Sequence, residues 1–545
     1  MKKILIILFS LFVSVPVILP LFHTGYFPTH DGEWAVVRLG DMFRSLRDLQ
    51  IPVRYSGDLN FNYGYPLFNF AYPFPYYLGI VLHFLGSGFV DAVKFIFAVS
   101  VLLSGLFMFL AGRLLWKNTW AGIVCAILYT YFPYRMVDLY VRGSIGESLS
   151  FVLFPLLFYL TIKLVNKFSI FSVCGIAISI AILIMTHNIM TVLFMPVYMS
   201  FIIGQIILKN KKSIKQLVAG IVLGLGMSAF FWIPALFEKN NILLSRMPIA
   251  DRNLYFVTLN EFLLPRWGYG VPTDPNGFSY QLGLVHLAIF IVVILSLLFT
   301  FLKNKKEAKD NSRKIALLLT IISSFYTFLL FKPSDFLWKN IPLFSEINYP
   351  WTALGILGFL VSLLAGFLCK QYFGKYMIVF LAATAIFFVL PYAKPERYFS
   401  KADDYYLTND ATTTSSNELM PLWVKKFPFQ RPSSKVEIIK GQGVIEGVFS
   451  NSKRVKFSVN TSYESIVRIN TIYYPGWKVS VDKANIAISY SNEKGVMDIS
   501  VPSGNHIVDA EFGETPLRLI SDIISISSFF ILLLFIIKRN KYAFS

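Results

Sequence analysis

Twelve apolar runs constrain the fold of this chain more than any other feature of its sequence. A helix that crosses a lipid bilayer needs about 20 mostly apolar residues. Over the 545 residues, 55% are hydrophobic and only 15% are charged, which is too apolar for a soluble protein of this length. The runs lie at 4–22, 90–115, 119–133, 146–165, 169–186, 188–208, 216–236, 284–302, 315–331, 349–369, 376–391 and 519–537. The sequence therefore predicts a polytopic α-helical membrane protein with about 12 transmembrane helices.

The lysines predict the orientation of these helices. They fall in alternate loops, at Lys2, Lys3, Lys117, Lys163, Lys167, 209–215, 303–314, Lys370, Lys375 and Lys538 to Lys541. Because short cytoplasmic loops carry an excess of positive charge, we expect a cell-membrane protein with both termini cytoplasmic and an extracytoplasmic active face. A cleaved signal peptide is the alternative for the first run, but this run ends in "LPLFHTGYF", without a small-residue cleavage site.

The predicted extracytoplasmic segments are of two kinds, helical and β-stranded. In the first outside loop, 23–89, residues 34–50 alternate as an amphipathic helix does, which predicts a helix lying on the membrane. From about 435 to 514 the chain has short alternating runs such as "VKFSVN" and "WKVSV", which predict a small antiparallel β-domain. The polar stretch 399–420 is typical of a linker or surface loop.

These features divide the chain into three parts. We expect a transmembrane domain at 1–391, an extracytoplasmic linker and β-sandwich-like domain at 392–518, and a final transmembrane helix with a cytoplasmic tail at 519–545. The three cysteines lie inside apolar runs, where a thiol is ordinary helix packing. No P-loop, dinucleotide-binding glycine motif or His/Cys metal cluster is present in the sequence. We therefore expect no nucleotide or dinucleotide cofactor and no nucleic-acid partner.

Several stretches resemble, in order, a group of bacterial membrane proteins labelled as 6-pyruvoyl-tetrahydropterin synthase-related. They are "THDGEWAVVRLGDMFRSL", "NYGYPLFNFAYPFPYYLG", "VRGSIGESLSFVLFPLLF", "THNIMTVLFMP", "YPWTALGILGF" and "NELMPLW". The group looks like the GT-C superfamily of glycosyltransferases. That resemblance implies a GT-C-like fold, a polyprenyl-phosphate-linked sugar donor, and transfer on the outer face of the bilayer to a glycan, lipid or protein acceptor.

The resemblance also implies a catalytic acid. GT-C proteins place an essential acidic residue just after the first span, and Asp31 in "PTHDGEW" is the matching position. Some GT-C enzymes use a D-x-D-like pair with a divalent metal, so Asp31 and Glu33 imply a possible Mg²⁺ or Mn²⁺ site, with His30 beside them. The alternative for Asp31 is an N-cap of the following helix, and Glu33 is equally typical of a first-turn acid.

Transfer from a lipid phosphate also needs cations that stabilise the departing phosphate. Arg142 is our first candidate, because it lies at an outer span boundary and Glu147 follows closely enough to orient its guanidinium. Further candidates are Arg135, His187 and Arg266. The alternative for Arg142 is a snorkelling interfacial arginine, that for His187 is a packing histidine, and that for Arg266 is an interfacial anchor.

The sequence thus predicts an inverting or retaining glycosyltransferase of the membrane. A transporter or flippase of a lipid-linked saccharide is one alternative, although it needs ionisable residues deep inside the spans, and here they gather at the outer ends. The other alternative is a non-catalytic scaffold that presents the β-domain to partners.

Overall fold

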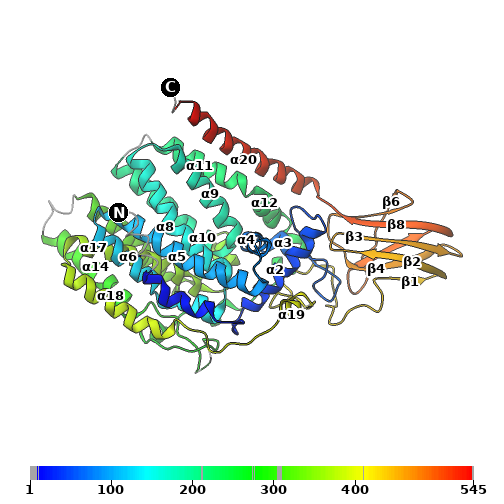
Figure 1. The fold of residues 1–545 in the computed structure, drawn as a ribbon, viewed down its shortest axis with the longest axis horizontal. Coiled ribbons are helices and arrows are strands. Elements are labelled where there is room, and N and C mark those ends of the chain that lie inside the picture. Colours follow the sequence, from blue (N-terminus) through cyan, green and yellow to red (C-terminus); the bar gives the residue numbers. More distant parts are fainter. Residues whose placement is uncertain are drawn as a thin grey trace.

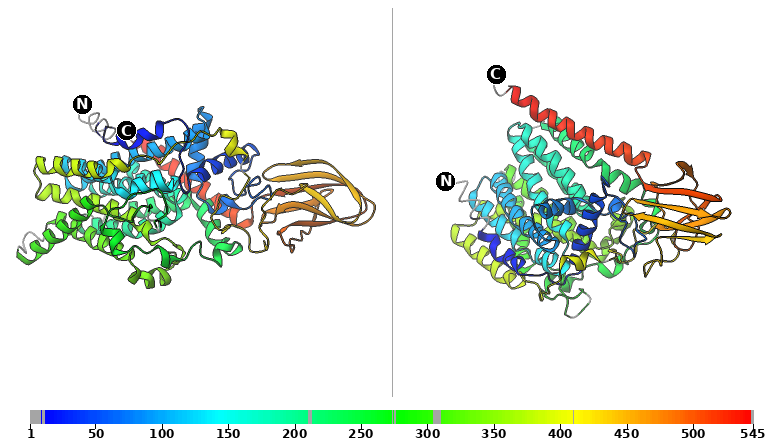
Figure 2. Two further views of the ribbon diagram at one scale, coloured as in Figure 1. Left: turned by 90° about the horizontal axis from the view of Figure 1, so that it is seen from below. Right: turned by 45° about the vertical axis from the view of Figure 1, so that its right-hand side comes forward.

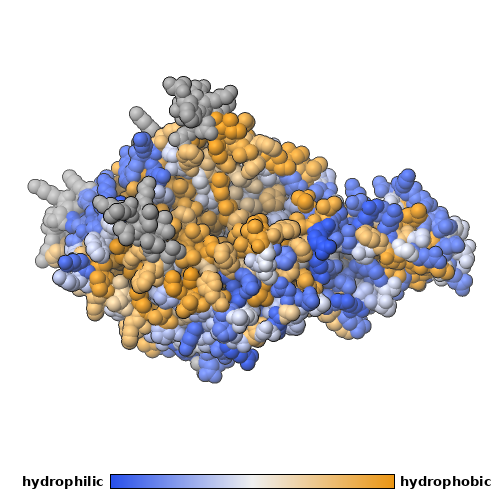
Figure 3. All heavy atoms as spheres, viewed as in Figure 1, coloured by the Kyte–Doolittle hydropathy of each residue, from blue (hydrophilic) through white to orange (hydrophobic). Residues whose placement is uncertain are grey.

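A bundle of helices and a C-terminal β-domain make up the molecule (Figure 1). The computed structural model describes residue 9 and residues 12–542, apart from 210–212, 273, 275, 304–309 and 409. Parts of the first run and of the lysine-bearing loops, at 1–8, 210–212 and 304–309, lie outside the described residues. The β-domain projects from one end of the bundle, and apolar side chains cover much of the bundle's visible surface (Figure 3).

Eight helices of the described residues are long and apolar enough to cross a membrane. They are α5 (Phe89–Trp116), α8 (Ile145–Asn166), α10 (Asn188–Leu208), α14 (Leu284–Lys303), α15 (Asn311–Leu329), α17 (Ala353–Gln371), α18 (Lys375–Val389, continued by η11, Leu390–Tyr392) and α20 (Pro516–Tyr542). A ninth span is possible from α11 (Ile214–Met227) and α12 (Ala229–Phe237), which are bent by 68°. The bend lies at Ser228, after Gly224 and Gly226, and glycine and serine pairs are a usual cause of such kinks.

The predicted count of twelve spans is not confirmed. Two predicted runs form helices shorter than 18 residues, α6 (Thr119–Thr130) and α9 (Ile170–Thr186), and the first run is described only in part, with a helix at Phe12–Phe22. Asn118 caps α6 by accepting hydrogen bonds from two backbone N–H groups, so this helix begins three residues after α5 ends. Hydropathy detected the segments of α6 and α9, and their helices are 12 and 17 residues long, which is less than a full span needs.

Shorter helices connect these spans. They are η1 (Leu19–Phe22), α2 (Gly32–Arg47), α3 (Leu67–Phe70), α4 (Phe74–Phe84), α7 (Pro133–Val137), the π-helical turn η2 (Asp138–Arg142), η4 (Lys239–Asn241), η5 (Leu243–Ser245), η6 (Arg252–Tyr255), α13 (Leu259–Leu263), η8 (Lys332–Ser334), α16 (Asp335–Asn340), η9 (Phe344–Glu346), η10 (Pro350–Thr352) and α19 (Asp403–Leu407).

Helix α2 differs from the amphipathic surface helix predicted at 34–50. It begins two residues earlier and ends three residues earlier, and protein covers it on both sides, because it packs against α4, α5 and α19. Asp41, a polar residue of the predicted amphipathic helix at 34–50, is 1% exposed. The prediction of an exposed polar face is therefore wrong: the amphipathic pattern marked a helix with buried polar groups.

The C-terminal domain confirms the predicted antiparallel β-fold. Its strands are β1 (Val436–Lys440), β2 (Gly443–Ser450), β3 (Arg454–Thr461), β4 (Ser465–Ile472), β5 (Trp477–Val481), β6 (Ala484–Ile486), β7 (Val496–Val501) and β8 (Gly504–Phe512). They form two sheets, in the orders β1-β4-β7 and β2-β3-β8-β5-β6. Along β3, Val455, Phe457 and Val459 are buried while Lys456 is exposed, so alternate residues of the sheet face a common core.

Buried ion pairs fasten this domain to the bundle. Arg518, at the start of α20, donates to both carboxylate oxygens of Glu238, at 2.9 and 2.7 Å, directly after α12. Tyr474 of the β-domain and Asn69 of α3 donate to the same carboxylate. Helix α20 then runs back along α11 and α12 (Figure 2). The junction fixes the β-domain against the helices.

Candidate active site

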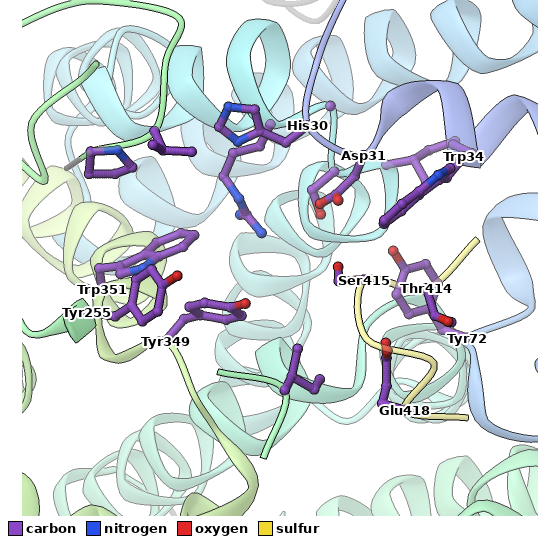
Figure 4. Close-up of a pocket in the computed structure, with 18 of the residues that line it drawn as sticks. His30, Asp31, Trp34, Tyr72, Tyr255, Tyr349, Trp351, Thr414, Ser415 and Glu418 are labelled. Atoms are coloured by element: carbon purple, nitrogen blue, oxygen red, sulfur yellow. The ribbon is translucent and has the colours of Figure 1, made fainter. Parts of the chain in front are cut away.

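A cavity of approximately 550 Å³ opens at one end of the bundle. The start of α2, the start of α8, the turn before α17 and the loop at 414–418 line it. Figure 4 shows His30, Asp31 and Trp34 on one part of its wall, Thr414, Ser415 and Glu418 on another, and the rings of Tyr255, Tyr349 and Trp351 facing them. The lining residues lie at the ends of the candidate spans or between them.

The side chain of Asp31 lines the cavity and makes no hydrogen bond to the described residues. It is the N-cap residue of α2, but its carboxylate makes no cap hydrogen bond. The hydroxyl of Thr29 accepts from the Gly32 N–H instead, at 2.9 Å. Among the described residues the carboxylate accepts no hydrogen bond, and it points into the cavity (Figure 4). The capping alternative is therefore not supported by the geometry of the side chain.

Backbone pairing brings Asp31 next to Arg142. The N–H groups of His30 and Asp31 donate to the carbonyls of Val141 and Arg142, at 3.0 and 2.8 Å. Gly143 makes this approach possible, because its φ is +67° and a Cβ there would lie 2.4 Å from the Thr29 hydroxyl. Two segments that are more than 100 residues apart in the sequence thus present an acid and a cation to one cavity.

Buried carboxylates orient the Arg142 guanidinium. Its Nη1 donates to Glu147, to Asp138 at 3.5 Å and to the Tyr134 hydroxyl at 3.2 Å. Burial raises the pKa of Asp138 well above its usual range, and the charge of Glu147 raises it further. The guanidinium lies over the ring of Trp351, 4.6 Å from its centroid. Its Nε and Nη2 have no hydrogen-bond partner among the described residues, so they remain available to an anion in the cavity.

His30 lines the same cavity as a neutral ring. Burial lowers its pKa from 6.5, and this effect exceeds the opposing effect of the Asp31 charge. The Nε2 atom lies 3.4 Å from the carbonyl oxygen of Tyr269. A neutral imidazole leaves Arg142 and Arg38 as the charged cationic side chains of this cavity.

The other predicted site residues do not line the cavity. Glu33 pairs with Lys401, at 2.8 Å. Arg135 is buried between helices, where it donates to Ser104 and lies over two aromatic rings. His187 caps α10 and stacks on Tyr72, so it supports a lining residue from behind. Arg266 donates to the carbonyl of Pro272 and braces its own loop.

The donor set does not fit a metal centre built on Asp31 and Glu33. Residues two positions apart at a helix start do not face each other, and Glu33 is engaged by Lys401. Within the described part of the chain, no three His, Cys, Asp or Glu side chains converge as metal ligands. We therefore derive no step through a metal.

The sequence did not predict Arg38, Glu418 or the aromatic wall of the cavity, which is formed by Tyr255, Tyr349 and Trp351. Arg38 follows Asp31 by seven residues, which places both on one face of a helix, and that spacing was a usable signal. The stretch 399–420, predicted as a linker or surface loop, packs into the protein: Arg38 donates to the carbonyl and, at 3.1 Å, to the hydroxyl of Thr413. Glu418 and Trp351 lie in the stretches "NELMPLW" and "YPWTALGILGF" that carried the family resemblance.

Comparison with known proteins settles the family. A family model described as a 6-pyruvoyl-tetrahydropterin synthase related domain, a membrane protein, matches residues 68–394, more than half of the chain. The chain belongs to this family. The match to the 6-pyruvoyl-tetrahydropterin synthase-related family confirms the resemblance that the sequence stretches indicated, and it places the chain in a membrane. It covers Arg142 and Trp351, whereas Asp31 and Glu418 lie outside it.

A curated relative and three solved structures are similar to this family member. An uncharacterized protein of Lactococcus lactis subsp. cremoris (strain MG1363) is 23% identical over 339 residues, which is 60% of this chain and 53% of that protein. The chain thus spans about half the length of this curated relative.

The solved structures are similar at low sequence identity. The apo oligosaccharyltransferase of Archaeoglobus fulgidus is 13% identical, with a TM-score of 0.42, over 78% of this chain and 61% of that one. The same archaeon's AglB, in complex with an inhibitory peptide and a dolichol-phosphate, is 14% identical, with a TM-score of 0.41 and the same coverage. The arabinofuranosyltransferase AftD from Mycobacteria is 13% identical, with a TM-score of 0.44, over 71% of this chain and 26% of that one.

Proposed function

We propose that this protein transfers a sugar from a polyprenyl-phosphate donor to an acceptor hydroxyl outside the cytoplasm. The observation that carries the proposal is the pairing, in one cavity, of the Asp31 carboxylate and the Arg142 guanidinium, whose Nε and Nη2 have no hydrogen-bond partner among the described residues. A sugar phosphodiester needs both: a base for the acceptor's proton and a cation for the phosphate. The aromatic wall adds a surface on which the apolar face of a sugar ring can pack.

In the proposed reaction the acceptor oxygen bonds to the anomeric carbon of the sugar. The bond from that carbon to the phosphate oxygen breaks, and the polyprenyl phosphate leaves with the electron pair. Asp31 takes the acceptor's proton, and Arg142, oriented by Glu147, stabilises the charge on the phosphate. The acceptor is a glycan, a lipid or a protein.

Asp31→Asn tests this function. Asparagine caps a helix about as well as aspartate but cannot take a proton at neutral pH. We expect the variant to insert, fold and bind donor, while transfer from a radiolabelled polyprenyl-phosphate sugar in membranes falls by about 10²-fold or more. Thr29→Val is the matched control for capping, because it removes the cap hydrogen bond that the structure contains. Undiminished transfer by a well-folded Asp31→Asn protein contradicts the proposal.

The proposal requires the cavity to face outward, with both termini in the cytoplasm. The lysine distribution supports this orientation, which places the β-domain outside. Lys440 is exposed in this domain, so we expect Lys440→Cys to react with a membrane-impermeant thiol reagent on intact cells. Reaction only after the inner face has been made accessible would show the opposite orientation. It would contradict an acceptor outside the cytoplasm. Wild-type protein is the control, because its three cysteines are buried.

A further inference from the structure

The loop at 410–424 is held firmly against the bundle. Arg38 binds Thr413 through two donors, and the hydroxyl of Tyr65 lies 2.9 Å from the Thr413 hydroxyl. Farther along, the carbonyls of Glu418 and Met420 accept from the backbone N–H groups of Leu244 and Leu243, at 2.8 and 2.9 Å. These anchors tie the loop to α2, which carries Asp31, and to η5.

This anchored loop presents unpaired polar groups to the cavity. The Oε2 atom of Glu418 accepts from the Ser416 N–H at 3.1 Å, which fixes the direction of the carboxylate. Its Oε1 atom and the Ser415 hydroxyl have no hydrogen-bond partner among the described residues, although both side chains line the cavity. Figure 4 shows them across the cavity from Tyr255, Tyr349 and Trp351.

A polar wall that faces an aromatic wall matches the chemistry of a sugar ring. One face of such a ring offers C–H groups, which pack on aromatic rings, and its hydroxyls donate to carboxylates and serine hydroxyls. A sugar whose phosphate lies at Arg142 has Trp351 beside it, because that ring is in contact with the guanidinium. Its hydroxyls then face the opposite wall.

We propose that Glu418 and Ser415 bind hydroxyls of the sugar that is transferred, so that the 410–424 loop determines which sugar the protein accepts. This inference rests on the proposed function and deepens it. Glu418 is a specificity-determining residue here, distinct from Asp31, which takes the proton. The loop lies outside residues 68–394, which the family model matches.

The test measures binding of two kinds of probe to the full chain in lipid nanodiscs. One probe is farnesyl phosphate, and the others are farnesyl phosphates carrying arabinofuranose, mannose, glucose, galactose or N-acetylglucosamine. The ratio of the Kd of farnesyl phosphate to the Kd of each sugar-bearing probe reports what the sugar contributes. Trp34 and Trp351 line the cavity, so tryptophan fluorescence is a suitable signal.

We expect at least one sugar to bind more tightly than farnesyl phosphate alone in the wild type. Glu418→Gln should lower that ratio by about 10-fold, as for loss of a hydrogen bond to a charged group, and leave the Kd of farnesyl phosphate unchanged. Ser415→Ala should lower it less, because a neutral hydrogen bond is weaker. Glu446→Gln is the matched control, because Glu446 is exposed on β2, outside the cavity.

The outcomes separate the two proposals. Failure of the wild type to bind farnesyl phosphate contradicts the proposed function. If the wild type binds farnesyl phosphate but none of the five sugars increases its affinity, this inference is contradicted and the proposed function is not. The same holds if folded Glu418→Gln and Ser415→Ala leave the ratio of Kd values unchanged. If Glu418→Gln does not fold, Ser415→Ala decides the matter.

Discussion

At the scale of single residues, Asp31 at the start of α2 and Asp41 within it have different environments. Asp31 points into the cavity, whereas Asp41 lies inside the protein, 1% exposed, with one carboxylate oxygen that has no hydrogen-bond partner among the described residues. The pKa of Asp41 is raised from 3.8 to about 7, mainly by burial and next by the charge of Asp58. Arg44 and Ser56 oppose this rise, and the charge of Asp48 adds to it.

Asp41 therefore makes stability depend on pH. Because the folded protein holds this proton more tightly than the unfolded chain, the contribution of Asp41 to the free energy of unfolding is largest below pH 3.8. It falls as the pH rises to about 7 and stays low above that. Asp41→Asn removes this dependence, so at pH 8 we expect the variant to be more stable than the wild type, by on the order of 1 kcal/mol or more. Melting temperatures between pH 4.5 and 8 measure the effect. If the melting temperature of the variant equals that of the wild type at every pH, the predicted contribution of Asp41 is refuted.

At the scale of elements, the junction of α12, α20 and the β-domain depends on one buried ion pair. Arg518 is fully buried, and the Glu238 carboxylate receives hydrogen bonds from Arg518, Tyr474 and Asn69. Arg54 adds a second set of contacts, to Glu514 and Asp522 of the same C-terminal segment. Removing one partner of a buried pair leaves an uncompensated charge, whereas replacing both by apolar groups restores much of the stability.

We expect Glu238→Ala to cost about 3–5 kcal/mol and to expose the junction to proteolysis. The double variant Glu238→Leu with Arg518→Met should recover most of that loss. Thermal unfolding and limited proteolysis of the purified protein measure both effects. A single variant with a wild-type melting temperature, or a double variant that is no better than the single one, shows that the pair does not hold the junction.

The sequence predicted the elements better than the arrangement of the cavity. Apolar runs and alternating strands identified the helices and the β-domain, because those patterns are local. Hydropathy placed α9 to within one residue at each end, but it could not locate the bend at Ser228 or the end of α6 at Thr130, three residues before the end of the predicted run. Asp31 and Arg142 emerged from local context and family resemblance. Glu418 did not, because only the fold brings a polar loop beside Asp31, and a polar loop by itself indicates exposure.

At the scale of the whole molecule, the cavity gathers residues from segments far apart in the sequence at one end of the bundle. Transport needs a binding site that both sides of the membrane can reach in turn, usually near mid-membrane. Here the cavity of 550 Å³ lies at the ends of the spans, beside the segment that leads into the β-domain. This placement favours transfer at a membrane surface over passage through the membrane.

The most direct test of this account is a structure of the protein determined with bound undecaprenyl phosphate. We expect the phosphate within hydrogen-bonding distance of Nε or Nη2 of Arg142, with Asp31 lining the space into which a sugar would extend. We also expect Arg142→Ala to abolish density for the phosphate. A phosphate held halfway along the spans, or bound equally well outside the cavity in the wild type and in Arg142→Ala, contradicts the account.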